Sequence, residues 1–145
     1  MRMRALLTAA ALVTIGVGAV IAADDPVKTR EGLMKQIGGS MGALAAIAKD
    51  QKPYDAEAVK AALTTISANA KAFPDQFPAG SDANSEASPK IWENMDDFKA
   101  KAAKLGADAD QLLAQLPADA AGVGAAAGTL GQSCGGCHQL YRVKK

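Results

Sequence analysis

The chain has 145 residues, with 16 basic and 15 acidic side chains, so it lacks the dense positive charge of a nucleic-acid-binding surface. Aromatic residues make up 4% of the sequence, and alanine, leucine and lysine are plentiful while valine, isoleucine and threonine are sparse. This composition favours helices over sheets, and the length fits one domain.

Residues 1–23 are predicted to be a cleaved signal peptide. Two arginines precede an almost unbroken apolar run over 5–21, and small residues at Ala22 and Ala23 are followed by acids. A retained transmembrane anchor is the alternative, but it needs roughly 20 apolar residues, and this run is shorter. We expect cleavage after Ala22 or Ala23. Residues 24–145 then form a single domain, in which the loss of two arginines from 16 basic residues leaves 14 against 15 acidic ones.

Two helices are predicted in the first half of this domain. The first runs from about Pro26 to Asp50, and Arg30 occupies one place in its otherwise apolar stripe. Pro53 ends the pattern, and Asp55 caps the second helix through its carboxylate. The apolar residues of the first stripe are Val27, Met34, Ile37, Met41, Leu44 and Ala48, and those of the second are Val59, Ala62, Leu63, Ile66, Ala70 and Phe73.

After a loop over 74–87, Ser88 and Pro89 indicate the start of a third helix, with serine as N-cap and proline at the first helical position. This helix is predicted to continue without a break to Pro117. A fourth helix follows, although its glycines each lower helix propensity by about 1 kcal/mol relative to alanine, and a loop over 118–125 is the alternative. The third stripe is Ile91, Met95, Phe98, Ala102, Leu105, Ala109, Leu112 and Leu116, and the fourth is Val123, Ala127, Leu130, Cys134, Cys137 and Tyr141.

Four amphipathic helices joined mainly by short connections predict an all-α fold, an antiparallel four-helix bundle. No segment after the leader is apolar enough to span a membrane, so we expect a mature protein that does not cross one. Because aromatic residues are few, the core depends on small aliphatic side chains, and a large flat cofactor would help to fill it.

The motif that carries chemistry is Cys134-Gly135-Gly136-Cys137-His138. Two thiols at this spacing can bond to both vinyl groups of one haem, and the adjacent imidazole then lies under the iron, which makes C-x-x-C-H the attachment signature of haem c. A structural zinc site needs four ligands, and the chain has two cysteines and one histidine. A thioredoxin-like pair would accompany strands, and a plain disulfide would not require the histidine.

With this motif near its C-terminus, the sequence resembles the class II cytochromes c, which include cytochrome c′ and cytochrome c-556. The resemblance covers essentially all of the mature chain and is carried by Arg30-Glu31-Gly32-Leu33-Met34-Lys35, Lys52-Pro53-Tyr54-Asp55, Ser88-Pro89-Lys90-Ile91-Trp92 and the segment from Cys134 to Arg142. It implies a four-helix bundle that binds one covalent haem c, with its iron, on the last helix, and a location in the bacterial periplasm. Relatives are often homodimers formed through the first two helices.

The second axial ligand of the iron follows from the resemblance rather than from spacing. A single histidine excludes bis-histidine ligation within one chain. Met41 and Met95 are expected to fill the core. Met34 follows Arg30 by four residues, at the position that faces the distal side of the haem in this family. Methionine there is similar to the six-coordinate, low-spin cytochrome c-556 branch, so we expect His138/Met34 ligation, with simple packing of Met34 as the alternative.

Arg30 has two interpretations from sequence: it pairs with a haem propionate, or its side chain extends from the first helical turn into water. Glu31 is expected to face solvent. Phe77 and Trp92 are expected to pack in the core or at the haem edge. The basic end of the chain is either a solvated tail or a docking site for an acidic redox partner, and it comprises Arg142, Lys144 and Lys145.

The predicted function is electron transfer in the periplasm by a low-spin monohaem cytochrome, which exchanges electrons with partner proteins and is not an enzyme. A five-coordinate cytochrome c′ that binds NO or CO at an open distal site is the main alternative. A haem-free thiol protein of the cell envelope is a more remote one.

Overall fold

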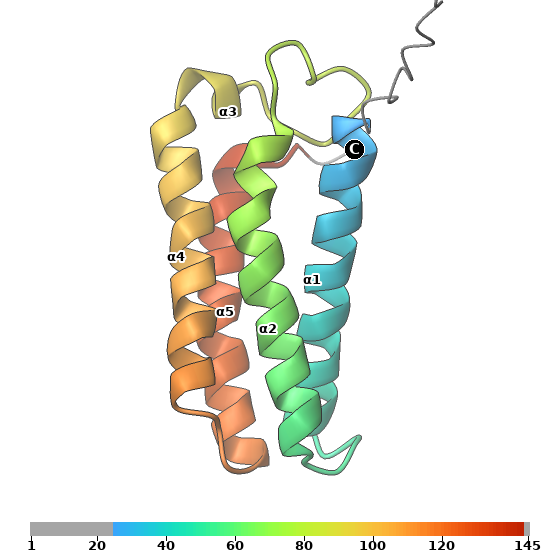
Figure 1. Ribbon diagram of the computed structural model, residues 1–145, viewed down its shortest axis with the longest axis vertical. Helices are drawn as coiled ribbons and strands as arrows, with labels where there is room; N and C mark the ends of the chain where they lie inside the picture. The colour runs from blue at the N-terminus through green and yellow to red at the C-terminus, as the bar shows by residue number, and fades with distance from the viewer. Residues whose placement is uncertain (1–24, 144–145) are drawn as a thin grey trace, which may run out of the picture.

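The computed structural model describes residues 25–143, so the predicted signal peptide and the last two lysines lie outside the described residues. Four long helices form an antiparallel bundle (Figure 1): α1 (Pro26–Ala48), α2 (Ala56–Ala72), α4 (Met95–Ala114) and α5 (Ala120–Tyr141). A 3-10 turn, η1 (Phe73–Gln76), and a short helix, α3 (Lys90–Glu93), lie in the connection between α2 and α4. Both α1 and α4 pack on α2 and on α5. The predicted four-helix bundle is confirmed. Among residues 25–143, none of the helices combines the length and the apolar character that a membrane span requires.

Three aspartates begin the long helices α1, α2 and α5. Asp25 accepts a hydrogen bond from Val27 N at 2.9 Å, and Asp55 accepts one from Glu57 N, also at 2.9 Å. Asp119 accepts one from the backbone N–H three residues later at 2.8 Å. Each carboxylate satisfies an N–H group that has no partner inside its helix. The predicted cap at Asp55 is confirmed, and the loop alternative for 118–125 is wrong from residue 120 onward.

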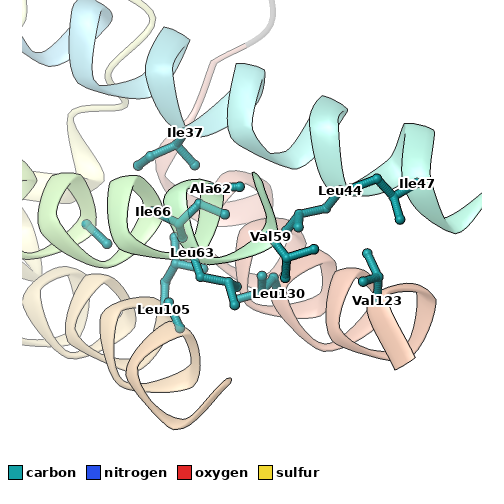
Figure 2. Packing of buried hydrophobic residues seen from close by; sticks show 12 residues of the cluster. Ile37, Leu44, Ile47, Val59, Ala62, Leu63, Ile66, Leu105, Val123 and Leu130 are labelled. Carbon is teal, nitrogen blue, oxygen red and sulfur yellow. The ribbon is translucent and has the colours of Figure 1, made fainter. Parts of the chain in front are cut away.

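The main core lies where the four long helices meet, and Figure 2 shows Leu44 of α1, Leu63 of α2 and Leu130 of α5 within it. These three side chains are 0% exposed. The predicted inner face of the second helix is buried throughout. In the first helix, Ile47 is buried although it was not part of the predicted stripe, while Met34 and Met41 are only partly buried.

A second cluster lies at the end of the bundle near α3 and is mainly aromatic. Phe98 of α4 is at its centre, with ring centroids 4.7 Å from Phe77 and 5.4 Å from Tyr141. Phe73 and Ile91 complete the buried part of this cluster. We call these five residues the aromatic cluster, and it packs beside the site described below.

The prediction of one continuous third helix is wrong, because the chain breaks at Asn94. Asn94 has φ −136° and ψ 51°, which ends α3 after Glu93 and starts α4 at Met95. Asparagine has a lower helix propensity than alanine or leucine, which favours a boundary at this residue. The apolar spacing hid the break, because Ile91 and Phe98 are both buried on either side of it.

Candidate functional site

A cavity of about 640 Å³ lies between the helices, next to the aromatic cluster. Its volume falls within the range of roughly 300–1,000 Å³ that is typical of small-molecule sites. The wall includes every predicted site residue: Arg30 and Met34 from α1, and Cys134, Cys137 and His138 from α5. Residues that are widely separated in the sequence therefore border a single space.

The two cysteines are half-buried in this wall and are free thiols, so the alternative of a disulfide is not supported. Burial raises the pKa of both thiols, Cys134 and Cys137, which keeps them protonated near neutral pH. Within residues 25–143, no three His, Cys, Asp or Glu side chains converge to hold a metal ion. The zinc alternative therefore lacks a ligand set in the described part of the chain.

His138 lies on the last turns of α5 and borders the cavity while part of its surface stays exposed. Its pKa is lowered, first by burial and then by the positive charge of Arg142, against a smaller opposing effect of Glu86. The neutral imidazole is thereby favoured, and this is the form that offers a lone pair to a metal.

The end of α5 is tied to the segment that precedes α3. Ser88 N donates to Tyr141 O at 3.0 Å, and Val143 N donates to Glu86 O at 2.9 Å. Arg142 Nε also pairs with Glu86 Oε2 at 2.7 Å, so this arginine contributes less to a basic docking surface than its sequence position suggested. These contacts fix the helical turn that carries the histidine.

Tyr141 supports the same turn from the side of α4. Its hydroxyl donates to Asp97 Oδ2, and this hydrogen bond, together with burial and the negative charge, raises the pKa of Tyr141 to about 12. The tyrosine ring packs against Phe98 within the aromatic cluster. The inward position predicted for Tyr141 is confirmed, since its exposed fraction is 6%.

Two methionines of α1 border the cavity, and the sequence had singled out one of them. Met34 contacts both the main core and the aromatic cluster, whereas Met41 packs on the main core and also lines the cavity. Seven residues of α-helix separate them by roughly 10 Å along the axis. Met95 packs against the aromatic cluster and is not part of the cavity wall, as its predicted packing role requires.

Arg30 is buried, with 4% of its surface exposed, so the prediction that it extends into water is wrong. Its Nη1 donates to Gln76 O at 3.2 Å and to Ser81 Oγ at 2.9 Å. Its Nη2 donates to Ser81 O and to Ser85 Oγ, the latter at 2.8 Å. These four hydrogen bonds use as many hydrogens as the two Nη atoms carry. The guanidinium carbon also lies 4.6 Å from the centre of the Phe77 ring.

The electrostatic setting of Arg30 is unusual for a buried charge. Burial lowers its pKa, and the more distant carboxylates of Glu31, Asp25 and Asp82 offset that effect only in part. Its acceptors in the 76–85 segment are carbonyl and hydroxyl oxygens, which are neutral. A positive charge in the wall of the cavity is suited to a ligand that carries carboxylates.

Two glycines border the cavity, one on α1 and one on α5. A Cβ atom built on Gly38 of α1 or on Gly131 of α5 would meet nothing within 4 Å, and both residues border the cavity. At these two positions the wall of the cavity carries no side chain, which leaves room for a bound cofactor. Phe77 also lines the cavity, whereas Trp92 does not and instead donates from Nε1 to Pro78 O at 3.2 Å. Glycines were noted in the last helix from sequence, but their spacing did not single out Gly131.

The chain matches a family model described as Cytochrome C' over residues 25–142. Cytochrome c-556 of Agrobacterium tumefaciens (strain II Chrys) is 76% identical over 119 residues, which cover 82% of this chain and 98% of that protein. Cytochrome c-556 of Agrobacterium fabrum (strain C58) is 64% identical over 145 residues, covering 100% of this chain and 99% of that protein. Among solved structures, cytochrome c′ from Rhodopseudomonas palustris is 32% identical with a TM-score of 0.79, covering 85% of this chain and 99% of that one.

Proposed function

This chain belongs to the cytochrome c′ family, and from that premise we propose that it transfers electrons as a six-coordinate, low-spin cytochrome with His138 and Met34 as its axial ligands. Its cofactor is covalently bound haem c with one iron. When bound, haem supplies an iron centre that alternates between ferrous and ferric states. The protein's part is to hold, orient and shield that centre.

The observation that carries the proposal is that Met34 and His138 border the same cavity from two different helices, α1 and α5. A thioether is a soft ligand that suits haem iron and raises its reduction potential. The curated relatives at 76% and 64% identity are both named cytochrome c-556, the branch in which a methionine is expected at this position. The fold does not separate the branches, since a cytochrome c′ shares it at a TM-score of 0.79.

We assign the covalent attachment to Cys134 and Cys137. They are the two cysteines of the whole sequence, and both lie in the cavity wall beside His138. Each thiol would add its S–H across one vinyl group, which consumes no oxidant. Haem that leaves the protein on acid–acetone extraction would contradict this assignment.

The side chains around the ligands would keep water away and limit movement. Phe98 and Ile91, which are 1% and 2% exposed, border the cavity from α4 and α3. Because both ligands lie on helices packed into one bundle, little has to move when an electron arrives or leaves. The protein acts in this proposal as a carrier and not as an enzyme.

Arg30 is the proposed contact for a haem propionate. Its charge is buried at the cavity wall and is met in this structure by neutral oxygens, which supports an anionic partner. The Nη hydrogens of Arg30 already donate to the 76–85 segment. The propionate would therefore accept a hydrogen bond from Nε–H, unless the segment moves and releases an Nη hydrogen.

The predicted signal peptide supports a location in the periplasm, and we propose other redox proteins as the partners of this chain. The family model and the relatives named cytochrome c-556 support a cytochrome, and redox proteins are the electron donors and acceptors that we propose for it. A homodimer through the first two helices stays a prediction from the resemblance.

The absorption spectrum, recorded with and without carbon monoxide, tests the proposal. We expect low-spin bands that carbon monoxide does not alter. Met34→Leu should give a high-spin iron that binds carbon monoxide, whereas Met41→Leu is the matched control and should keep the wild-type spectrum, because both methionines border the cavity from α1. A wild-type spectrum that is high-spin and shifts with carbon monoxide would favour the gas-binding alternative instead.

A further inference from the structure

The connection between η1 and α3 passes close to the first turns of α1 at one end of the bundle (Figure 1). Arg30 joins the two elements, since its guanidinium reaches Gln76 O, both oxygens of Ser81 and the hydroxyl of Ser85. Phe77, in the same connection, packs on the guanidinium face and borders the cavity. One side chain thus links a helix of the cavity wall to a segment that also borders the cavity, through Phe77 and Ser85.

Apart from Arg30, the first turns of α1 contribute only partly buried side chains, such as Leu33 and Met34, to the packing. Of the residues in α1 before Leu44, Arg30 and Ile37 are the buried ones. The cavity occupies the space that apolar side chains from the neighbouring helices would otherwise fill, so this half of the helix is held less by the hydrophobic core than the half that carries Leu44 and Ile47.

We infer that Arg30 is a positioning residue that fastens segment 76–85 to the first turns of α1 and so holds Met34 and Phe77 in the wall of the haem cavity. The inference rests on the proposed function only where it takes Met34 to be an iron ligand. Met34 lies four residues after Arg30, one turn further along the same helix.

The two roles proposed for Arg30, holding segment 76–85 and contacting a propionate, differ in whether they need the planar shape of the arginine side chain. A propionate contact needs a positive charge and a few donors, which a lysine ammonium also provides. The link to segment 76–85 needs a planar fork, because two nitrogens each reach two oxygens. The two serine hydroxyls, Ser81 Oγ and Ser85 Oγ, can be removed without changing the arginine, while the carbonyls of Gln76 and Ser81 stay as its acceptors.

The test is hydrogen exchange of backbone amides in the haem-loaded protein, with the substitutions on one side of the Arg30 link and the measured amides on the other. The variants Ser81→Ala and Ser85→Ala change the segment, and the amides of residues 30–34 in α1 are the readout. Ser88→Ala is the matched control, since Ser88 is about as buried as Ser85 (7% against 8%) and its hydroxyl accepts from Lys90 N rather than from Arg30. Arg30→Lys completes the set.

In the Ser81→Ala/Ser85→Ala double variant, we expect the amides of residues 30–34 to exchange at least about tenfold faster than in the wild type. The reason is that hydrogen bonds to a charged group are among the stronger ones. Arg30→Lys should do at least the same and should also speed exchange at Ser81 N, while Ser88→Ala should leave residues 30–34 unchanged. Reference amides of Leu63 and Ala109 in the main core should keep their rates.

Three results would overturn the inference. The double serine variant could match Ser88→Ala at residues 30–34, Arg30→Lys could match the wild type, or the reference amides could accelerate as much as those of α1. The spectrum separates this test from that of the proposed function. If the wild-type iron is already high-spin, the assignment of Met34 fails while the exchange rates still decide the role of Arg30. If the inference holds, Arg30→Lys should also raise the high-spin fraction, whereas Met34→Leu should change the spectrum without speeding exchange at Ser81 N.

Discussion

Phe98→Ala removes the centre of the aromatic cluster and opens the cavity wall at the same time. Phe98 is 1% exposed, and its ring lies 4.7 Å, 5.4 Å and 5.9 Å from the rings of Phe77, Tyr141 and Phe73. Tyr141 is one turn beyond His138, so loss of this packing loosens the turn that carries the proposed iron ligand.

The expected loss in the free energy of unfolding follows from the burial of Phe98 and from its ring contacts. Replacing a buried phenylalanine by alanine lowers the free energy of unfolding by about 3–5 kcal/mol. Three lost aromatic pairs, each worth about 0.5–1.5 kcal/mol beyond their burial, place Phe98→Ala in the upper half of that range. For a domain of this size, a loss of that order lowers the melting temperature by roughly 15–20 °C.

Urea unfolding of the haem-loaded protein, followed by far-ultraviolet circular dichroism and by haem absorbance, measures both effects. Val123→Ala is the control, since Val123 is 0% exposed in α5 but does not border the cavity. It should cost about 2 kcal/mol, from two lost carbons and the space they leave, with no change in the haem spectrum. A loss below about 1.5 kcal/mol for Phe98→Ala, or an unchanged spectrum, would refute the packing argument.

Two further predictions concern acid stability and helix propensity. Burial raises the pKa of Asp108, but hydrogen bonds from Lys104 and Ser133 outweigh it, and the net pKa is lowered. The ionised carboxylate of Asp108 therefore stabilises the fold above its unfolded pKa, and this stabilisation is lost as pH falls through the folded pKa. Asp108→Asn should lower the melting temperature near pH 6, and the melting temperatures of variant and wild type should converge in strong acid. A difference in melting temperature that stays constant across this pH range would contradict the linkage. Gly128→Ala should stabilise the haem-loaded protein by about 1 kcal/mol in urea unfolding, because the new Cβ meets open space in a helix. Gly131→Ala should gain less, since Gly131 borders the cavity that the haem would fill, and an equal gain at both sites would count against that placement.

Much of the fold follows from local pattern. The inner face predicted for the second helix is buried from Val59 to Phe73, since helical spacing alone decides which side chains share a face. The cap at Asp55 was predicted for a similar reason, as a carboxylate before an apolar stripe satisfies the first N–H groups. The break at Asn94 was missed, because a short change of direction leaves the apolar spacing on both sides intact.

Arg30 shows where local pattern stops being informative. Its acceptors lie 46–55 residues further along the chain, in the last residue of η1 and the loop after it, which carry no periodic signal, and so its burial could not be read from the first helix. The same limit applies to Met41, whose stripe position predicts packing but does not reveal that the cavity reaches it.

The helical class, the four-helix arrangement and the attachment motif can be read from the printed residues, because side-chain spacing and a contiguous C-x-x-C-H string are properties of neighbouring residues. Packing between distant segments sets which methionines and glycines border the cavity and where the charge of Arg30 is held. These features depend on how distant segments meet across the bundle, and the free energy of those contacts is not encoded in any single stretch of the chain.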